Sequence, residues 1–202
     1  TDAPVKFANQ NTTSDRHMPT TILLIRHGET DWNVAGKFQG HIDRPLNANG
    51  IAQANALAEV CESLGLGLVV SRDLQRASGT SQIVADRAGV ACQISPAFRE
   101  VHMGEAEGST YEENLEAFGE EIMRMWFYID PTDEPSLQRT FPGGESRRAM
   151  YDRFRQRLDE ILDDPDGDVL PNIRIEICDP IDPNLVSPAS GSASGNTSAL
   201  VH

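Results

Sequence analysis

Short, largely apolar runs alternate along this chain with longer stretches in which apolar residues recur every three or four positions. The runs at 21–25 and 68–71 lack polar alternation, which is typical of strands buried on both faces of a parallel sheet, and the run at 90–94 is predicted as a third strand. The helical spacing predicts helices over the ranges 47–64, 73–88, 111–128 and 146–162. This order of elements predicts an α/β fold with a mostly parallel sheet.

The remaining segments differ in pattern. Between residues 173 and 177, isoleucine alternates with Arg174 and Glu176, and this period of two predicts a half-exposed or edge strand. Residues 131–144 form a long connection that is a candidate lid over a site. The polar residues 1–19 predict a disordered tail, and the proline-, serine- and glycine-rich residues 178–202 predict a low-complexity tail. One domain is therefore expected over residues 20–177.

The charge of the chain limits its partners. The formal net charge of −14 over 202 residues argues against nucleic acid or an anionic membrane as the main partner. A phosphate pocket in such an acidic protein would depend on a few specifically placed arginines. No apolar run reaches the length of a membrane span, and residues 1–19 lack the apolar centre of a secretory signal. The three cysteines contain no CxxC pair and are expected to be reduced thiols, so the expected location is cytoplasmic.

The apolar run that ends at Ile25 is followed at once by Arg26, His27 and Gly28. Ligand sites in open α/β sheets lie just beyond the carboxyl ends of such strands. An arginine fork matches phosphate oxygens, a neutral imidazole can act as a nucleophile near pH 7, and a glycine lets an anion approach the backbone. These residues alone leave two alternatives open, a phosphate site or a surface histidine beside an arginine.

Arg76 is a second cation whose position indicates an anion. It falls in the first turns of the predicted helix 73–88, beside the end of a strand. The backbone amides and the helix dipole favour anions there, so a cation is unfavourable unless an anion binds nearby. A salt bridge to Asp73 is the alternative. Lys37 and Arg44, in the turn-rich loop after Asn33, either reach a ligand or stay in solvent.

Longer blocks of sequence carry a family resemblance. They are Arg26-His27-Gly28-Glu29-Thr30 with Trp32-Asn33, followed by the blocks at 39–47, 71–77, 99–108 and 142–146. In this order they resemble the histidine phosphatase superfamily, also called the phosphoglycerate mutase-like family, over residues 20–163. The resemblance implies a three-layer α/β sandwich with a mostly parallel sheet and a cap formed by residues 100–145. It implies an enzyme that needs no cofactor or metal, and the histidines of the chain show no metal-ligand spacing.

The resemblance also implies a role for each matched residue. His27 is the nucleophile that becomes a phosphohistidine, and Glu100 protonates the leaving group and then deprotonates water. The phosphoryl group and the substrate are bound at the family's contact positions, which are Arg26, Asn33, Gln39, Gly40 and Arg76. Without the resemblance, Glu100 is one of several acids in an acidic loop. His102, in the same loop, is expected to be structural.

One family feature has no match in this chain. The family has a second histidine, followed by glycine, at the end of another buried strand after the helix that here ends near Leu162. A central strand, this His-Gly pair and a helix are expected to be missing, roughly 25–35 residues. Loss of that cation should lower the rate by about 100-fold or more, and loss of the strand should leave unpaired edges. Truncation, omission of residues from the sequence, and replacement by another segment such as 185–202 are the three explanations.

These observations favour a phosphatase that acts on small phosphorylated metabolites. The block with Arg99, Glu100, Gly104 and Glu107 resembles the phosphatase branches more than the glycolytic mutase. That mutase is the second hypothesis among enzymes. A catalytically silent phosphate-binding protein is the hypothesis from another class, because half of the expected phosphate pocket has no match. The sequence indicates neither a specific substrate nor an oligomeric state.

Overall fold

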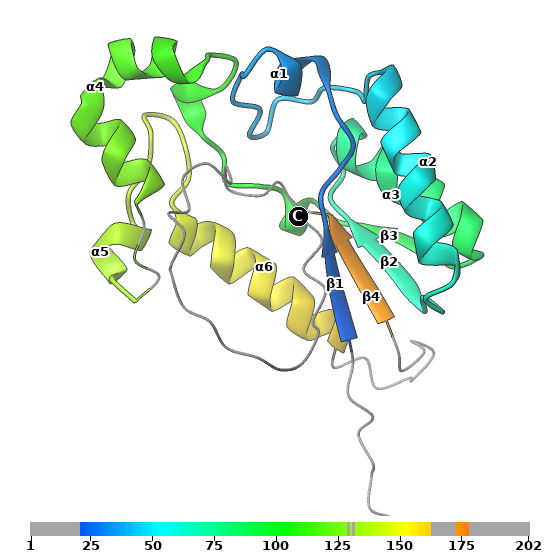
Figure 1. Cartoon of the computed structure of the whole chain (residues 1–202). Coiled ribbons are helices and arrows are strands. Elements are labelled where there is room, and N and C mark those ends of the chain that lie inside the picture. The colour runs from blue at the N-terminus through cyan, green and yellow to red at the C-terminus, as the bar shows by residue number, and fades with distance from the viewer. Residues whose placement is uncertain (1–20, 129, 131, 163–172, 178–202) are drawn as a thin grey trace, which may run out of the picture.

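Four parallel strands form one sheet in the order β1-β4-β2-β3 (Figure 1). The computed structural model describes residues 21–128, 130, 132–162 and 173–177. The strands are β1 (Thr21–Ile25), β2 (Leu68–Ser71), β3 (Cys92–Ile94) and β4 (Ile173–Ile177). The helices are α1 (Asp31–Val34), α2 (Ala48–Glu62), α3 (Gln75–Ala88), α4 (Tyr111–Phe127), α5 (Glu134–Leu137) and α6 (Arg147–Leu162), with 3-10 turns η1 (Pro96–Phe98) and η2 (Gly104–Ala106). The parallel pairing brings the carboxyl ends of the strands to one edge of the sheet.

Helices cover both faces of this sheet. Val69 packs with residues of α2 and α3, whereas Leu68 and Val70 pack with residues of α6 and η1. Because successive side chains of a strand point to opposite faces, α2 and α3 lie on one side of the sheet and α6 on the other (Figure 1). The structure therefore has the three layers that the family resemblance implies.

Small side chains allow α2 to pack closely against the sheet and α3. Ala54, Ala58 and Cys61 follow a helical stripe and are at most 1% exposed. Ile51 and Leu64 continue the same apolar spacing at the two ends of this stretch, but they are 48% and 40% exposed. Burial raises the pKa of the Cys61 thiol, which suits a reduced cysteine that fills the core.

The cap beside the sheet contains α4 and α5 (Figure 1). Residues of α4 share an apolar cluster with Val101, Ala106 and Phe141. Met123 and Trp126 of α4 are at most 3% exposed in this cluster. The single helix predicted over 111–128 is present as α4, but it breaks at Gly119, whose φ of +83° lies outside the helical region.

The segment predicted as a loop over 131–144 is more structured than its sequence indicates. It contains α5, and Leu137 and Phe141 are each 1% exposed. Phe141 packs against Trp126, with ring centroids 4.6 Å apart. Phe141 thus fastens the end of this segment to α4, and a role as a lid stays a prediction.

The prediction of an edge strand over 173–177 is wrong. β4 pairs in parallel with β1 on one side and with β2 on the other. Alternation of apolar and polar residues describes the two faces of a strand, whereas the number of neighbouring strands is set by backbone pairing. β4 thus lies inside the sheet, between β1 and β2. The absence of a family strand and of the second His-Gly pair stays a prediction.

The predicted tails, 1–19 and 178–202, lie outside the described residues, so the domain boundaries stay predictions. Within the described ranges, no helix is both long enough and apolar enough to cross a membrane. Cys61 and Cys92 are free thiols, while Cys178 lies outside the described residues. The cytoplasmic location stays a prediction.

Candidate active site

The candidate active site lies at the carboxyl edge of the sheet. Leu24 of β1 and Val70 of β2 both pair with Glu176 of β4, so these two residues are level. Two positions further along, Arg26 and Arg72 lie level with each other at the carboxyl edge of the sheet. One strand lies between them, so their backbones are about 10 Å apart. The segment that carries His27 thus meets the start of α3 across this edge.

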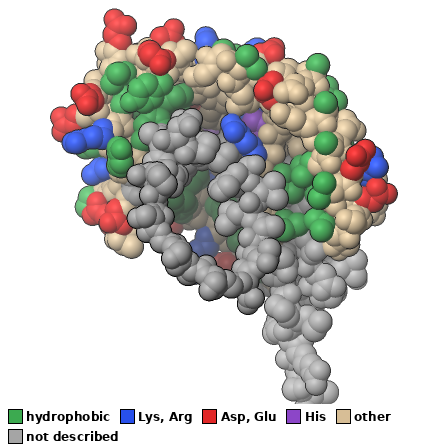
Figure 2. Space-filling model, viewed as in Figure 1, with side chains coloured by type: hydrophobic (Ala, Val, Ile, Leu, Met, Phe, Trp, Pro, Cys, Tyr) green, Lys and Arg blue, Asp and Glu red, His purple; other side chains and the backbone are tan. Residues whose placement is uncertain are grey.

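Charge is distributed unevenly over the molecule. Figure 2 shows acidic side chains mostly around the rim of one face, where basic side chains also lie, whereas a histidine and a further basic side chain lie near its centre. The chain as a whole has a net charge of −14. A basic centre within an acidic surface attracts small anions locally.

His27 is buried directly after β1, with 4% of its surface exposed. Its Nδ1 lies 2.6 Å from the carbonyl oxygen of Gly28. Because a carbonyl oxygen can only accept a hydrogen bond, Nδ1 carries the proton and Nε2 carries the lone pair of the neutral ring. This contact fixes both the tautomer and the orientation of the imidazole.

Gly28 connects the histidine to two helices. Its N–H donates to Oγ1 of Thr80 at 3.0 Å, and the Thr80 hydroxyl donates to the carbonyl of Arg76 at 2.8 Å. A side chain at Gly28 would place its Cβ 2.3 Å from the carbonyl oxygen of Gly50 in α2. Only glycine permits this approach, so the loop with His27 is held between α2 and α3.

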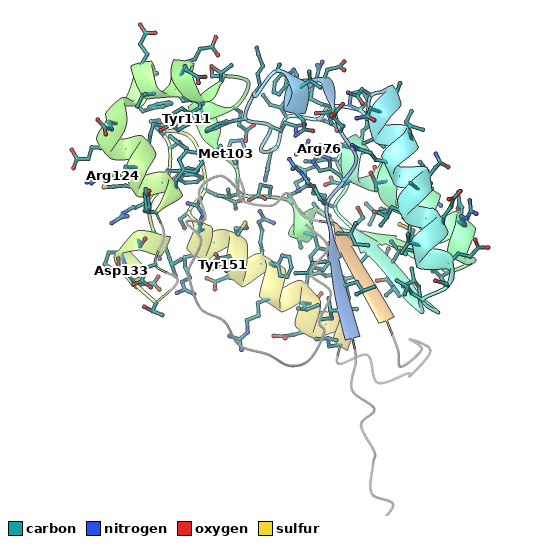
Figure 3. All side chains as sticks on the ribbon, in the orientation of Figure 1. Arg76, Met103, Tyr111, Arg124, Asp133 and Tyr151 are labelled. Carbon is teal, nitrogen blue, oxygen red and sulfur yellow. The ribbon has the colours of Figure 1, made fainter. Side chains whose placement is uncertain are left out.

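Arg76 is fully buried in the first turn of α3, beyond the arrowheads of the strands (Figure 3). Its Nη1 donates to the carbonyl of Ile42 at 2.9 Å and its Nη2 to that of Gly40 at 2.8 Å. Gly40 has a φ of +47°, and a Cβ there would lie 2.0 Å from Oε1 of Glu107. Through these two hydrogen bonds, Arg76 holds the turn at Gly40 against the start of α3.

Asp73, the partner considered for Arg76, forms an ion pair with Arg99. Nε of Arg99 donates to Oδ1 of Asp73 at 2.6 Å, and a second nitrogen of the guanidinium contacts Oδ2. The hydrogen bonds from Arg99 hold the pKa of the Asp73 carboxyl below its usual value of 3.8. The pair fastens the start of α3 to the loop that carries Glu100.

Asn33 and Gln39 meet around the hydroxyl of Thr30. The Asn33 Oδ1 accepts from the Thr30 backbone N–H at 2.9 Å, and the Thr30 side chain in turn caps α1. The Thr30 Oγ1 lies 2.9 Å from Oδ1 of Asn33 and 3.0 Å from Oε1 of Gln39. Since both amide oxygens face Thr30, both amides turn their NH₂ groups away from it. An NH₂ group is a donor that suits a phosphoryl oxygen.

Glu100 is held through its own backbone. Its carbonyl oxygen accepts from Nε2 of His41 at 2.7 Å and from Nη2 of Arg153 at 2.9 Å. Its carboxylate Oε1 accepts from the backbone N–H of Val101 at 3.0 Å. Burial lowers the pKa of His41, so a neutral ring with its proton on Nε2 donates to the carbonyl. His102 stacks edge-on against His41, at 4.8 Å between ring centroids.

The other predicted cations lie further out. Arg26 is exposed at the end of β1. Lys37 and Arg44 both lie over the ring of Trp32, at 5.7 and 5.0 Å from its centroid. Hydrogen bonds therefore hold in place the segments that carry most of the predicted site residues: His27, Arg76, Asn33, Gln39, Gly40 and Glu100. Lys37 and Arg44 instead lie over the ring of Trp32. The roles of all these residues stay proposals.

Several contributors to the site were missed from the sequence: Thr30, Arg72, Thr80 and Arg153. Thr30 could have been recognised, because Thr-x-x-Asn is a variant of the capping box. Arg72 is fully buried just beyond β2, and its position after a strand is the same signal that singled out Arg26. Among the described residues, no group of three or more histidine, cysteine or acidic side chains could hold a metal ion.

Replacing Asp73 with Asn is expected to lower the melting temperature near pH 7 and to have no effect at strongly acidic pH. A carboxyl whose pKa is depressed on folding stabilises the protein above its unfolded pKa, near 3.8, and loses this contribution as the pH falls through the lower folded value. The partly exposed pair should contribute about 1 kcal/mol at most. Thermal melts from pH 7 down to pH 3 measure the effect. Asp86→Asn, on the exposed side of α3, is the control, and a constant Asp73→Asn difference across this range would contradict the assignment.

The sequence matches the model of the histidine phosphatase superfamily (branch 1) over residues 22–171. A probable phosphoglycerate mutase GpmB from Serratia proteamaculans is 36% identical over 146 residues, which is 72% of this chain and 65% of that protein. GpmB proteins from several Salmonella strains are 34% identical over the same length. The chain thus matches slightly less than two thirds of the length of these relatives.

Solved structures with a similar fold include phosphatases. A mycobacterial glucosyl-3-phosphoglycerate phosphatase in complex with VO3 has a TM-score of 0.67 and 29% identity, over 77% of this chain and 74% of that one. A putative alpha-ribazole-5'-P phosphatase from Escherichia coli has a TM-score of 0.62 and 27% identity, over 77% and 72% of the two chains. The family model covers most of the chain, and the fold and the order of the sequence blocks agree with it. This chain belongs to the histidine phosphatase superfamily.

Proposed function

We propose that this chain hydrolyses phosphate monoesters of small metabolites through a phosphohistidine at Nε2 of His27. The observation that carries the proposal is the 2.6 Å contact between Nδ1 of His27 and the Gly28 carbonyl. It assigns the lone pair of the neutral ring to Nε2. A buried, oriented imidazole of this kind is a nucleophile that needs no separate base.

The proposed reaction has two steps. Nε2 of His27 attacks the phosphorus, the bond from phosphorus to the ester oxygen breaks, and the carboxyl group of Glu100 gives its proton to the departing oxygen. Water then attacks the phosphohistidine while the Glu100 carboxylate takes its proton. The bond from phosphorus to Nε2 breaks, phosphate leaves, and Glu100 is protonated again. Throughout, the Gly28 carbonyl stabilises the positive charge that develops on the ring.

Cations and amide donors would hold the transferred group. Arg76 presents a buried guanidinium fork, which donates to the carbonyls of Ile42 and Gly40 and suits the oxygens of a phosphoryl group. Arg26, level with Arg72 at the edge of the sheet, and the NH₂ groups of Asn33 and Gln39 are the further donors. Fixed donors around a phosphoryl group are usually the largest contribution to catalysis.

A trapping experiment tests the phosphohistidine. The protein is mixed with p-nitrophenyl phosphate, denatured rapidly in base, and digested for mass spectrometry. A phosphoryl group that is stable in base, labile in acid and attached to His27 is expected. Turnover with no phosphohistidine, or with the label on another residue, would refute the mechanism.

Mutase activity is the second candidate, because the GpmB relative is named a probable phosphoglycerate mutase and is 36% identical. A mutase returns the phosphoryl group from the histidine to another hydroxyl of the substrate, whereas a phosphatase passes it to water. With 3-phosphoglycerate, a phosphatase releases phosphate and a mutase forms the isomer. Absence of both products, with phosphate still raising the melting temperature, would instead support a silent phosphate-binding protein.

A further inference from the structure

Arg147 is a buried cation that the proposed reaction does not use. It begins α6, is 8% exposed, and its guanidinium carbon lies 4.0 Å from the centroid of the Trp126 ring. Its buried Nη1 has no hydrogen-bond partner among the described residues. The structure thus places an arginine fork against an aromatic face without an acidic partner.

The neighbouring arginine, Arg148, has a carboxylate partner that Arg147 lacks among the described residues. Arg148 is part of an ion pair with Glu134, to whose carboxylate its Nε donates at 3.0 Å. In the described part of the chain, no carboxylate lies within 4.0 Å of the Arg147 guanidinium. Burial lowers the pKa of Arg147 to about 10, so it remains a cation at neutral pH. A buried cation without a counter-charge is unfavourable, and stacking on an aromatic ring offsets only part of this.

Arg147 faces the part of the site that contains Glu100. The residues before α6 are bound to the Glu100 loop, because the Glu145 N–H donates to the carbonyl of His102 and the Glu145 carboxylate accepts from the His102 N–H, both at 2.9 Å. The negative charge of Glu100 raises the pKa of Arg147, against the effect of burial. Tyr151, one turn further along α6, is labelled below α4 in Figure 3.

The first turn of α6 makes the requirement for an anion stronger. Arg147 and Arg148 both lie in this turn, which contains no acidic residue. A cation at a helix N-terminus opposes the helix dipole unless an anion compensates it. Glu134 supplies this charge to Arg148. Among the described residues, no carboxylate pairs with Arg147 in this way, and an acidic group of a ligand would fill this role.

We propose that Arg147 binds a second acidic group of the substrate, distinct from the phosphoryl group that His27 accepts. The inference rests on the proposed function and specifies its substrate class, phosphate monoesters that carry a carboxylate or a second phosphate. The guanidinium fork can bind either group through two parallel hydrogen bonds. Trp126 holds the plane of the fork, so little freedom is lost on binding.

A pair of substrates that differ in one group tests the inference. 3-Phosphoglycerate carries a carboxylate where glycerol 3-phosphate carries a hydroxymethyl group. Wild-type protein is expected to prefer 3-phosphoglycerate in kcat/KM, and Arg147→Met is expected to lower this preference by about 10- to 100-fold, the usual effect of a charge-assisted hydrogen bond. Arg147→Lys should keep part of the preference. Fructose 1,6-bisphosphate against fructose 6-phosphate tests a second phosphate in the same way.

Arg148→Met is the matched control, because it removes a neighbouring cation on the exposed side of α6. It should leave both preferences unchanged. If Arg147 acted only on the charge of Glu100, both members of a pair would lose activity equally and the preference would persist. An equal loss, or a wild-type protein that prefers neither acidic substrate, overturns the inference.

Binding measurements separate this inference from the proposed function. Calorimetric titration of 3-phosphoglycerate and glycerol 3-phosphate into the wild-type protein and Arg147→Met requires no turnover. If neither ester is hydrolysed but the wild-type protein binds 3-phosphoglycerate more tightly and Arg147→Met does not, the proposed function fails and the second anion site stands. If Arg147→Met does not fold, the same titration with Arg147→Lys decides, and an unchanged affinity ratio overturns the inference.

Discussion

Replacing His27 with alanine is expected to lower kcat for p-nitrophenyl phosphate by roughly 10⁴-fold or more, because the covalent step loses its nucleophile. The Nε2 lone pair is assigned by the hydrogen bond from Nδ1 to the Gly28 carbonyl. No other imidazole among the described residues lies directly beyond a strand of the sheet. Release of p-nitrophenol at saturating substrate measures the effect.

Two measurements distinguish a lost nucleophile from a damaged fold. The His27→Ala melting temperature should stay within a few degrees of the wild-type value, because alanine leaves the Gly28–Thr80 hydrogen bond intact. Added imidazole should restore part of the activity by occupying the space left by the ring. Retention of more than about a tenth of the wild-type rate would show that the phosphoryl group does not pass through this residue.

Local sequence patterns predict the helices and strands of this fold, but they do not predict which strands lie next to one another in the sheet. The uniform apolar runs around Ile25 and Val69 predict two strands of the parallel sheet, and both are present. Burial on both faces is confirmed for β2 but wrong for β1, because Ile22 and Leu24 are 38% and 65% exposed. The position of 173–177 between β1 and β2 could not be predicted, because strand order depends on contacts between distant segments. Gly119 interrupts a helix that its periodicity presents as continuous, since periodicity records faces and not backbone angles.

In the candidate site, too, single residues could be predicted from the local sequence, whereas the contacts between distant segments could not. Arg76 was singled out by a local argument, a cation at a helix start, and the structure buries it beside the loop of Gly40. The contacts that orient the reactive groups are long-range. Thr80 reaches Gly28 across 52 positions and Arg153 reaches Glu100 across 53. Thr80 and Arg153, which no sequence motif singled out, thus position the segments that carry the predicted site residues.

Replacing Glu100 with glutamine is expected to reduce kcat for glycerol 3-phosphate by about 10²- to 10⁴-fold, the usual effect of removing a general acid–base group. An alkoxide leaves only with a proton, so the first step fails. p-Nitrophenolate leaves without one, so with p-nitrophenyl phosphate the first step should survive and the second should slow. A burst of p-nitrophenol followed by slow turnover, with phosphohistidine accumulating on the protein, is the expected signature in stopped-flow measurements.

The control for this substitution comes from the same loop. Glu105 is an exposed carboxylate in η2, and Glu105→Gln should change neither substrate's rate appreciably. Since the Glu100 backbone is held by His41 and Arg153, Glu100→Gln should keep its place and differ only in its inability to exchange a proton. An equal loss for both substrates without a burst would assign Glu100 to substrate binding and leave the proton transfers to another group. A burst confined to p-nitrophenyl phosphate would tie both proton transfers to this one carboxyl, because a carboxyl that acted only as the base would leave a burst with both substrates.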